Sequence, residues 1–205
     1  MLGFTFTSLA LAATTIISGT LAQKFPNQSA PYNLKLLSDE PTLDGKFLSA
    51  CHSGAAIEQL CVSNTAATTS GVFYLNTTDS STVSGFDTGV LVYNLNYGGD
   101  ANLIASSALR FAFNPATNVV LSYFQPGDEG TDIAIVGLDA ESKLFIPSYV
   151  DDVVTPNGTG LFYQWHVCNT QFGSYKYLAL AWVTYGAPLD GDCKAVNVSA
   201  VPAAV

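Results

Sequence analysis

Asp151 and Asp152 are the residues of this sequence best suited to acid–base chemistry. Two carboxylates at a set separation can hydrolyse a glycosidic bond, one as the acid and the other as base or nucleophile. Neighbouring side chains on an extended chain point to opposite sides, so each aspartate would need a partner from elsewhere. The available partners are Asp128, Glu129, Asp190 and Asp192. The alternative interpretation, which we favour, is a solvated loop in which the aspartates accept backbone N–H bonds.

Two histidines, His52 and His166, are further candidates for a general base. The sequence contains no Gly-x-Ser-x-Gly turn, and no nucleophile can be placed beside either histidine. We therefore expect both histidines to be structural, with their ring nitrogens satisfied by the backbone. The stretch Tyr97-Gly98-Gly99-Asp100 matches neither a phosphate loop nor a dinucleotide fingerprint, so no cofactor is expected.

Four cysteines could form two disulfides or, with the histidines, a zinc site. In an oxidising compartment an even count predicts two bridges, with three possible connectivities. We favour Cys51–Cys61 and Cys168–Cys193, because each pair joins near neighbours across a turn-rich segment. Histidines stand next to Cys51 and two residues before Cys168, but no C-x-x-C or H-x-x-x-H spacing is present. Disulfides are therefore predicted and no metal site is expected.

The N-terminal segment has the features of a secretory signal. Its first charged side chain is Lys24, and an apolar stretch precedes Thr20-Leu21-Ala22, whose small residues suit signal peptidase. We expect residues 1–22 to be removed and residues 23–205 to form a single domain. No later stretch approaches the ~20 apolar residues that a membrane span needs. The mature chain carries four N-glycosylation sequons, which predict solvent-facing positions at Asn27, Asn76, Asn157 and Asn197.

The charge balance excludes some partners. Sixteen Asp and Glu face seven Lys and Arg, so the basic footprint needed to bind nucleic acid or an anionic membrane is missing. Only 11% of the residues are charged, so Ser, Thr, Asn and glycans must wet the surface. These features predict a protein that is secreted and stays outside the cell or in the cell wall.

Short β-branched and aromatic runs recur between clusters of Gly, Pro, Asn, Asp and Ser. This spacing, without any long helical pattern, predicts an all-β fold, either an antiparallel β-sandwich or a closed β-barrel, stabilised by the two disulfides. One helical turn is expected within residues 53–59. The expected strands are 32–37, 46–50, 57–62, 72–75, 90–95, 109–113, 119–124, 133–138, 144–146, 161–168, 175–183 and 195–198.

The segment 161–183 is predicted to be a central hairpin, because apolar residues alternate along both arms around Gln171-Phe172-Gly173-Ser174. We expect most of its aromatic rings to be core. Trp182 is expected to be buried. Trp165, beside two polar residues, is expected to be exposed, and with Tyr163 it is the candidate for binding a ligand.

Several segments of the mature chain carry a family likeness: 48–56, 60–61, 72–76, 89–93, 151–152, 162–168, 178–183 and 193–198. On these segments the sequence resembles an uncharacterised family of secreted proteins of filamentous ascomycete fungi. The likeness covers nearly the whole mature chain, and a more distant one joins it to fungal phialide-type cell-wall proteins. The resemblance implies secretion, disulfides, an all-β fold and a cell-wall location, and it carries over no catalytic residue.

Three functions are compatible with these observations. The first is a non-enzymatic extracellular or cell-wall glycoprotein that binds polysaccharide through exposed aromatic rings. The second is a secreted hydrolase of the glycosidase kind that uses Asp151 or Asp152. The third is a β-barrel that encloses an extracellular apolar small molecule, as a carrier or a cyclase-like biosynthetic protein. We rank them in this order.

Overall fold

The computed structural model describes residues 24–68, 71–97, 103–127, 132–150, 158–189 and 192–204. Its regular elements are strands, and all of them belong to one antiparallel sheet. The all-β prediction is therefore confirmed. The strands are β1 (Asn27–Gln28), β2 (Tyr32–Leu37), β3 (Phe47–Gly54), β4 (Ile57–Ser63), β5 (Phe73–Val83), β6 (Phe86–Tyr97), β7 (Leu103–Ala112), β8 (Val119–Pro126), β9 (Ile135–Leu138), β10 (Leu144–Tyr149), β11 (Thr159–Phe162), β12 (Trp165–Phe172), β13 (Tyr175–Val183), β14 (Lys194–Ala195) and β15 (Asn197–Pro202).

The strand pairings close the sheet on itself. Each neighbour in the series β2, β3, β4, β8, β7, β6 and β5 pairs with the next, and β5 returns to β2 through Tyr32 and Phe73. A closed sheet removes most of the unpaired edges that would invite another chain. Alternate side chains of these strands fill its interior: the rings of Phe73 and Phe124 stack at 5.6 Å, and Tyr93 lies 5.9 Å from Phe124.

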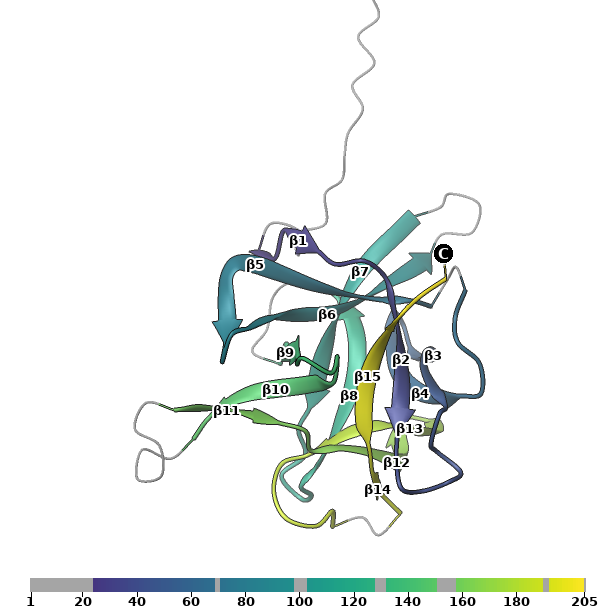
Figure 1. The fold of residues 1–205 in the computed structure, drawn as a ribbon. Helices are drawn as coiled ribbons and strands as arrows, with labels where there is room; N and C mark the ends of the chain where they lie inside the picture. The colour runs from purple at the N-terminus through teal and green to yellow at the C-terminus, as the bar shows by residue number, and fades with distance from the viewer. Residues whose placement is uncertain are drawn as a thin grey trace, which may run out of the picture.

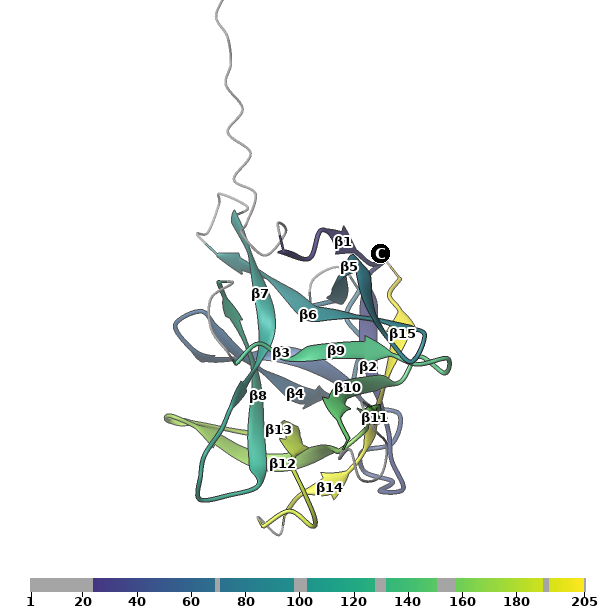
Figure 2. The same cartoon turned by 90° about the vertical axis from the view of Figure 1, so that its left-hand side faces the viewer.

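A second group of strands is joined to this closed sheet. Strand β13 pairs with β4 through Ala179 and with β8 through Ala181, and it carries β12 and then β14 on its other edge. Strands β9, β10 and β11 continue from β6, and β15 pairs with β2 along its whole length. In both views β12, β13 and β14 lie at the end of the molecule opposite β1 and β5 (Figures 1 and 2).

The β12–β13 hairpin confirms one prediction and corrects another. Strand β13 has the expected bounds, and Trp182 is buried as expected. Trp165 is 0% exposed, so the prediction that it faces solvent was wrong. Its indole N–H donates to the carbonyl of Leu144 at 2.8 Å, and its ring meets that of Trp182 at 4.8 Å. Adjacent residues of a strand point to opposite faces, so the polar His166 lies on the face opposite Trp165 and does not indicate that Trp165 is exposed.

The prediction of a helical turn within residues 53–59 was also wrong. Strands β3 and β4 form a hairpin there, with pairing that continues to Gly54 and Ile57. Ala56 occupies the turn with a φ of 56°, a left-handed conformation that a tight hairpin turn requires.

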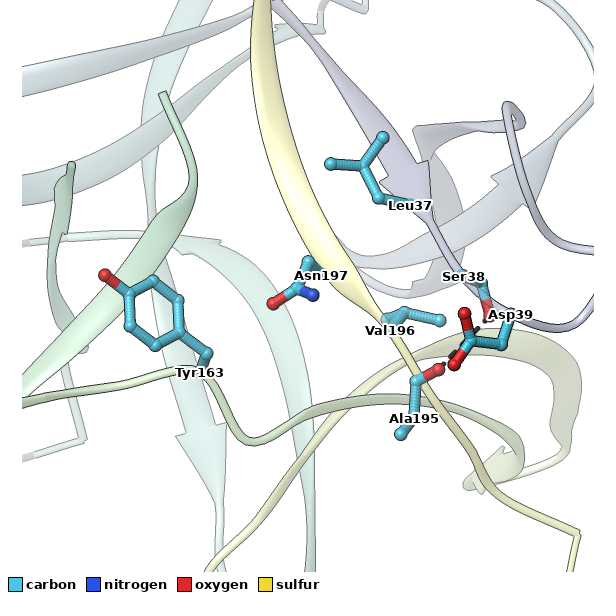
Figure 3. Close-up of a pocket in the computed structure, with 7 residues that line it drawn as sticks. All are labelled: Leu37, Ser38, Asp39, Tyr163, Ala195, Val196 and Asn197. Atoms are coloured by element: carbon cyan, nitrogen blue, oxygen red, sulfur yellow. Dashed lines mark hydrogen bonds between the residues drawn. The ribbon is translucent and has the colours of Figure 1, made fainter. Parts of the chain in front are cut away.

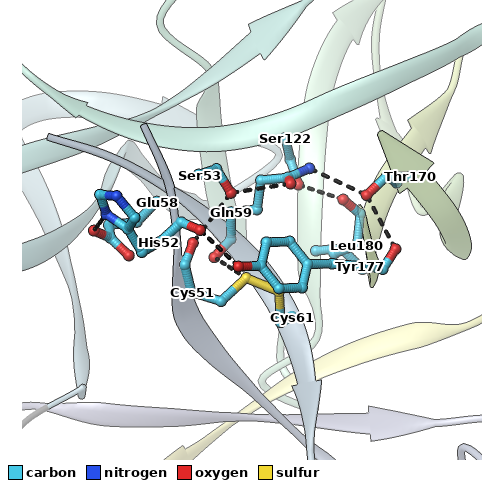
Figure 4. Close-up of a disulfide and its surroundings, with 10 residues drawn as sticks. All are labelled: Cys51, His52, Ser53, Glu58, Gln59, Cys61, Ser122, Thr170, Tyr177 and Leu180. Carbon is cyan, nitrogen blue, oxygen red and sulfur yellow. Dashed lines mark hydrogen bonds and ion pairs between the residues drawn. A yellow bond between two sulfur atoms is a disulfide. The ribbon is translucent and has the colours of Figure 1, made fainter. Parts of the chain in front are cut away.

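Both predicted disulfides are formed, Cys51–Cys61 and Cys168–Cys193. Cys51 is paired with Gln59 and Cys61 with Ser49, so the first bridge crosses the β3–β4 hairpin diagonally (Figure 4). The second bridge fastens β12 to the segment just before β14. The favoured connectivity is therefore confirmed.

Candidate functional site

The predicted carboxylate pair cannot be placed. Asp151 and Asp152 lie outside the described residues, as do Asp128, Glu129 and Asp190. The remaining partner that the sequence offered, Asp192, is exposed. An acid–base role for Asp151 or Asp152 therefore stays a prediction.

The two histidines lie on different strands, His52 on β3 and His166 on β12, and their surroundings differ. His166 is half-buried on β12, and its Nδ1 lies 3.2 Å from the carbonyl of Gln164. His52 is exposed; its Nδ1 lies 3.4 Å from Oε1 of the buried Glu58, and its ring meets that of Tyr175 edge-on at 5.5 Å. In the described ranges, no group of three or more His, Cys, Asp or Glu side chains could hold a metal ion.

A chain of buried polar side chains lies beside the first disulfide (Figure 4). Ser53 donates to Gln59 at 3.1 Å, Gln59 donates to Thr170 at 3.2 Å, and Thr170 donates to the carbonyl of Tyr177. Ser122 donates to the carbonyl of Leu180 at 2.6 Å. Each of these groups has a partner within the protein, so the chain serves to join β4, β8 and β12–β13 rather than to bind a ligand.

An ion pair joins Arg110 and Asp132. Nη1 of the buried Arg110 lies 2.7 Å from Asp132, whose second oxygen accepts the Tyr123 hydroxyl at 2.8 Å. Burial by itself would raise the pKa of Asp132, but the hydrogen bond from Tyr123 and the Arg110 guanidinium together lower that pKa. Burial, and then the hydrogen bond to Asp132, raise the pKa of Tyr123 to about 12.

Asp132→Asn should make the protein less stable at neutral pH and less sensitive to acid. The pKa of Asp132 is lower in the folded state than the ordinary 3.8, so its contribution is present above that value and is lost as pH falls through the folded pKa. Breaking a buried pair costs roughly 3–5 kcal/mol, and since the Asp132 side chain is 32% exposed we expect about 2 kcal/mol. Urea unfolding at neutral pH and at a series of acidic pH values measures both effects. The matched control is the exposed Asp192→Asn; equal acid profiles for Asp132→Asn and wild type would contradict the prediction.

Tyr163, predicted to bind a ligand, lines a groove beside β15 (Figure 3). Its hydroxyl donates to Asp139 at 2.8 Å. Burial and this hydrogen bond raise its pKa to about 12. We call this the β15 groove; its volume is about 340 Å³, and its lining residues are Leu37, Ser38, Asp39, Tyr163, Ala195, Val196 and Asn197.

A larger groove lies between β7, β10–β11 and β13. We call it the aromatic groove; its volume is about 460 Å³, and its lining residues are Phe111, Phe113, Ile146, Ser148, Phe162, Gln164, Trp182 and Thr184. Ile146 and Phe162 stand directly opposite each other on β10 and β11, which puts both on one face. Among the described residues that line this groove none is charged, and their polar groups are hydroxyls and the amide of Gln164.

Phe113 is the exposed aromatic ring of this groove, and its support is rigid. It is 68% exposed, and its ring meets that of Phe111 edge-on at 6.2 Å. Phe111 in turn packs on Trp165 and Trp182, at 6.3 and 6.4 Å. The two tryptophans are therefore core residues that hold the floor beneath an exposed ring, so the floor of the groove needs little ordering when a ligand binds.

The buried Asn118 joins two loops next to Thr184, which lines the aromatic groove. Its side-chain N–H groups donate to the carbonyls of Tyr185 and Ala187, at 2.6 and 2.9 Å, and its oxygen accepts from the backbone N–H of Leu189. Its own carbonyl accepts the backbone N–H of Thr184. The chain between β7 and β8 and the chain after β13 are thereby held together, at the lower end of Figure 1.

Sequence reasoning missed the aromatic groove because Phe113 was assigned to a strand. The alternation of Leu109, Phe111 and Phe113 runs directly into the turn Asn114-Pro115, and a large ring at the very end of a strand has little to cover it. The position of Phe113 at the end of this run was therefore the sequence signal that could have indicated an exposed ring. The other lining residues come from strands far apart in the sequence, and only the folded sheet brings them together.

The sequons occupy different environments. Asn27 is exposed, Asn197 is half-buried, and Asn157 lies outside the described residues. Asn76 is only 5% exposed, and its Oδ1 accepts from Nε2 of Gln28 at 3.3 Å. The expectation that Asn76 faces solvent was therefore wrong, because β1 pairs with β5 and covers it.

The fold and grooves define an all-β, disulfide-bonded domain. The chain belongs to the family described as domain of unknown function DUF7907, which it matches over residues 29–202. No curated protein and no solved structure shows a significant match. In the part of the chain that the structure describes, no helix is both long enough and apolar enough to cross a membrane.

Proposed function

We propose that this protein is an exported, N-glycosylated extracellular or cell-wall protein that binds a neutral polysaccharide in the aromatic groove. Support for export comes from the N-terminal signal, the acidic composition and two disulfides, which persist in oxidising compartments. The observation that carries the binding function is the groove itself, with an exposed ring, an apolar floor and an uncharged polar lining.

The chemistry of the groove fits a sugar chain. A pyranose ring has an apolar C–H face and a rim of hydroxyls, so it needs an aromatic surface together with neutral hydrogen-bonding groups. Phe113 and Phe162 provide the first, and Gln164, Ser148 and Thr184 provide the second. An anionic polysaccharide would meet no cation among the described residues of the groove lining, and the protein has a net charge of −9. A neutral glucan, chitin or mannan is therefore the expected ligand class.

The carrier function has less support. The interior of the closed sheet is filled by the packed rings of Phe73, Tyr93 and Phe124, together with fully buried leucines on β2 and β4.

Phe113→Ala should abolish most of the binding while leaving the fold intact. Truncating an exposed aromatic anchor of this kind costs at least about 1–2 kcal/mol of binding free energy, so we expect an affinity loss of about tenfold or more. Retention of purified protein on insoluble β-glucan, chitin and mannan, followed by titration calorimetry with soluble oligosaccharides of the retained polymer, measures this loss.

Tyr97→Ala is the matched control, because Tyr97 is also an exposed ring but lies at the end of β6, outside the aromatic groove. It should bind like the wild type. Two results would contradict the binding proposal. One is that none of the three polymers retains the wild-type protein, and the other is that Phe113→Ala is retained as well as the wild type.

A further inference from the structure

The β15 groove holds a modification signal in its wall. Asn197 is the first residue of β15 and of the sequon Asn197-Val198-Ser199, and its side chain extends toward the side on which Tyr163 lies (Figure 3). Within the described part of the chain its side-chain amide makes no hydrogen bond. By contrast, the amide of Asn27 donates to Asp79 at 2.6 Å on the exposed surface. The two sequons therefore differ: Asn197 lines a groove, whereas Asn27 is hydrogen-bonded on the exposed surface.

The groove has the size and chemistry to receive a sugar. Its volume of about 340 Å³ lies in the range of pockets that hold small molecules, from roughly 300 Å³ upward. The ring of Tyr163 and the side chain of Leu37 offer apolar surface, and Ser38 and Asp39 offer polar groups.

The walls of the groove are held in place by bonds within the protein. The hydrogen bond from Tyr163 to Asp139 fixes the ring, and the Ser38 hydroxyl donates to the carbonyl of Ala195 at 3.2 Å. A sugar entering this groove would therefore order little protein, and the covalent link to Asn197 would keep it at high local concentration.

We propose that the N-linked glycan of Asn197 folds back into the β15 groove, with its first N-acetylglucosamine against Tyr163. The inference rests on the exported, glycosylated state proposed above. A lipid-diphosphate-linked oligosaccharide is the donor: Nδ2 bonds to the anomeric carbon as the bond from that carbon to the diphosphate oxygen breaks, and the amide gives up one proton. The transfer takes place before β15 pairs with β2, so half-burial in the folded protein does not prevent it.

The test compares two glycans on one molecule. The full chain is exported from a eukaryotic host, and peptide mass spectrometry measures occupancy at Asn27 and Asn197. The native protein is then treated with an endoglycosidase that cuts between the two core N-acetylglucosamines. We expect cleavage at Asn197 to be about tenfold slower than at Asn27, since it requires the glycan to leave the groove first. After unfolding, the two rates should become equal.

Variants distinguish a glycan that is bound in the β15 groove from one that is protected only by steric hindrance. Tyr163→Ala should bring the native cleavage rate at Asn197 up to that at Asn27, and Tyr163→Phe, which keeps the ring, should retain the protection. Ser199→Ala removes the sequon but leaves Asn197, and it should lower the melting temperature relative to the glycosylated protein. For Tyr163→Ala, cooperative urea unfolding and a wild-type far-ultraviolet circular dichroism spectrum of the exported protein show that the fold is intact.

The following outcomes would overturn the proposal for the Asn197 glycan without contradicting the proposal that the aromatic groove binds polysaccharide. One is glycosylation at Asn27 with Asn197 left empty. The other is an occupied Asn197 whose glycan is cut at the rate of Asn27, or whose protection survives Tyr163→Ala. A chain that is neither exported nor glycosylated at any position would instead contradict the extracellular function itself, and polysaccharide binding is measured separately through Phe113.

Discussion

Trp165→Ala is expected to lower the free energy of unfolding by about 4 kcal/mol, near the middle of the roughly 3–5 kcal/mol typical of large aromatic truncations in a core. Trp165 is among the largest fully buried side chains, and it packs on Trp182 and Phe111 at the junction of the closed sheet with the β12–β13 hairpin. The substitution leaves a cavity, and it also removes the donor to the carbonyl of Leu144. Denaturant unfolding followed by far-ultraviolet circular dichroism measures the loss.

Phe113→Ala and Leu178→Ala are the matched controls for this prediction. Both side chains are large and apolar but exposed, so their removal should change stability by less than about 0.5 kcal/mol. Because Trp165 supports Phe111, which supports Phe113, the Trp165 variant should also bind polysaccharide less tightly. A Trp165→Ala protein as stable as either control would show that the buried position assigned to this ring is wrong.

Removal of the Cys168–Cys193 disulfide, as the double serine variant, should cost about 3–4 kcal/mol in the chain-entropy model, given its sequence separation of 25 residues. The segment that it closes includes β13 and the loop held by Asn118. Strand β14 contributes only a two-residue pairing to β12, so the sheet by itself holds this segment weakly. Urea unfolding of the purified variant, compared with the oxidised wild type, gives the difference.

The double serine variant of Cys51 and Cys61 is the internal control for this second prediction. Its bridge spans a separation of 10 residues, within a hairpin that is already paired along nearly its whole length. The same model gives a smaller cost, about 2.5–3 kcal/mol. An equal or larger loss for this short loop would show that the bridges act through native packing rather than through the unfolded chain.

Local patterns predicted much of the framework. The run Tyr175–Val183 was delimited correctly because turn residues stand on both sides of it and its alternation is unbroken. Strand β5 extends to Val83, well beyond the expected residues 72–75, because its second half is a polar run of Thr, Asp and Ser that carries no hydrophobic period. In that half pairing, rather than composition, makes the strand.

The candidate site was much less accessible to sequence reasoning. Periodicity tells which residues of a strand share a face, but not whether that face meets the core or the solvent. This is why Trp165 was assigned to the surface. Phe113, the exposed ring of the aromatic groove, was assigned to a strand and was not considered as a binding residue. Asn76 was expected in solvent because it begins a sequon, and the sequon gives no information about the two residues of β1 that cover it.

The sequence by itself determined the all-β class, the antiparallel hairpins and both disulfide pairs, because these depend on local patterning and on cysteines that are near in the chain. The tertiary structure decided the closure of the sheet, the burial of each face and the assembly of the aromatic groove from β7, β10, β11 and β13. Those features depend on contacts between strands far apart in sequence, and no local preference encodes which distant strand will supply the opposing surface.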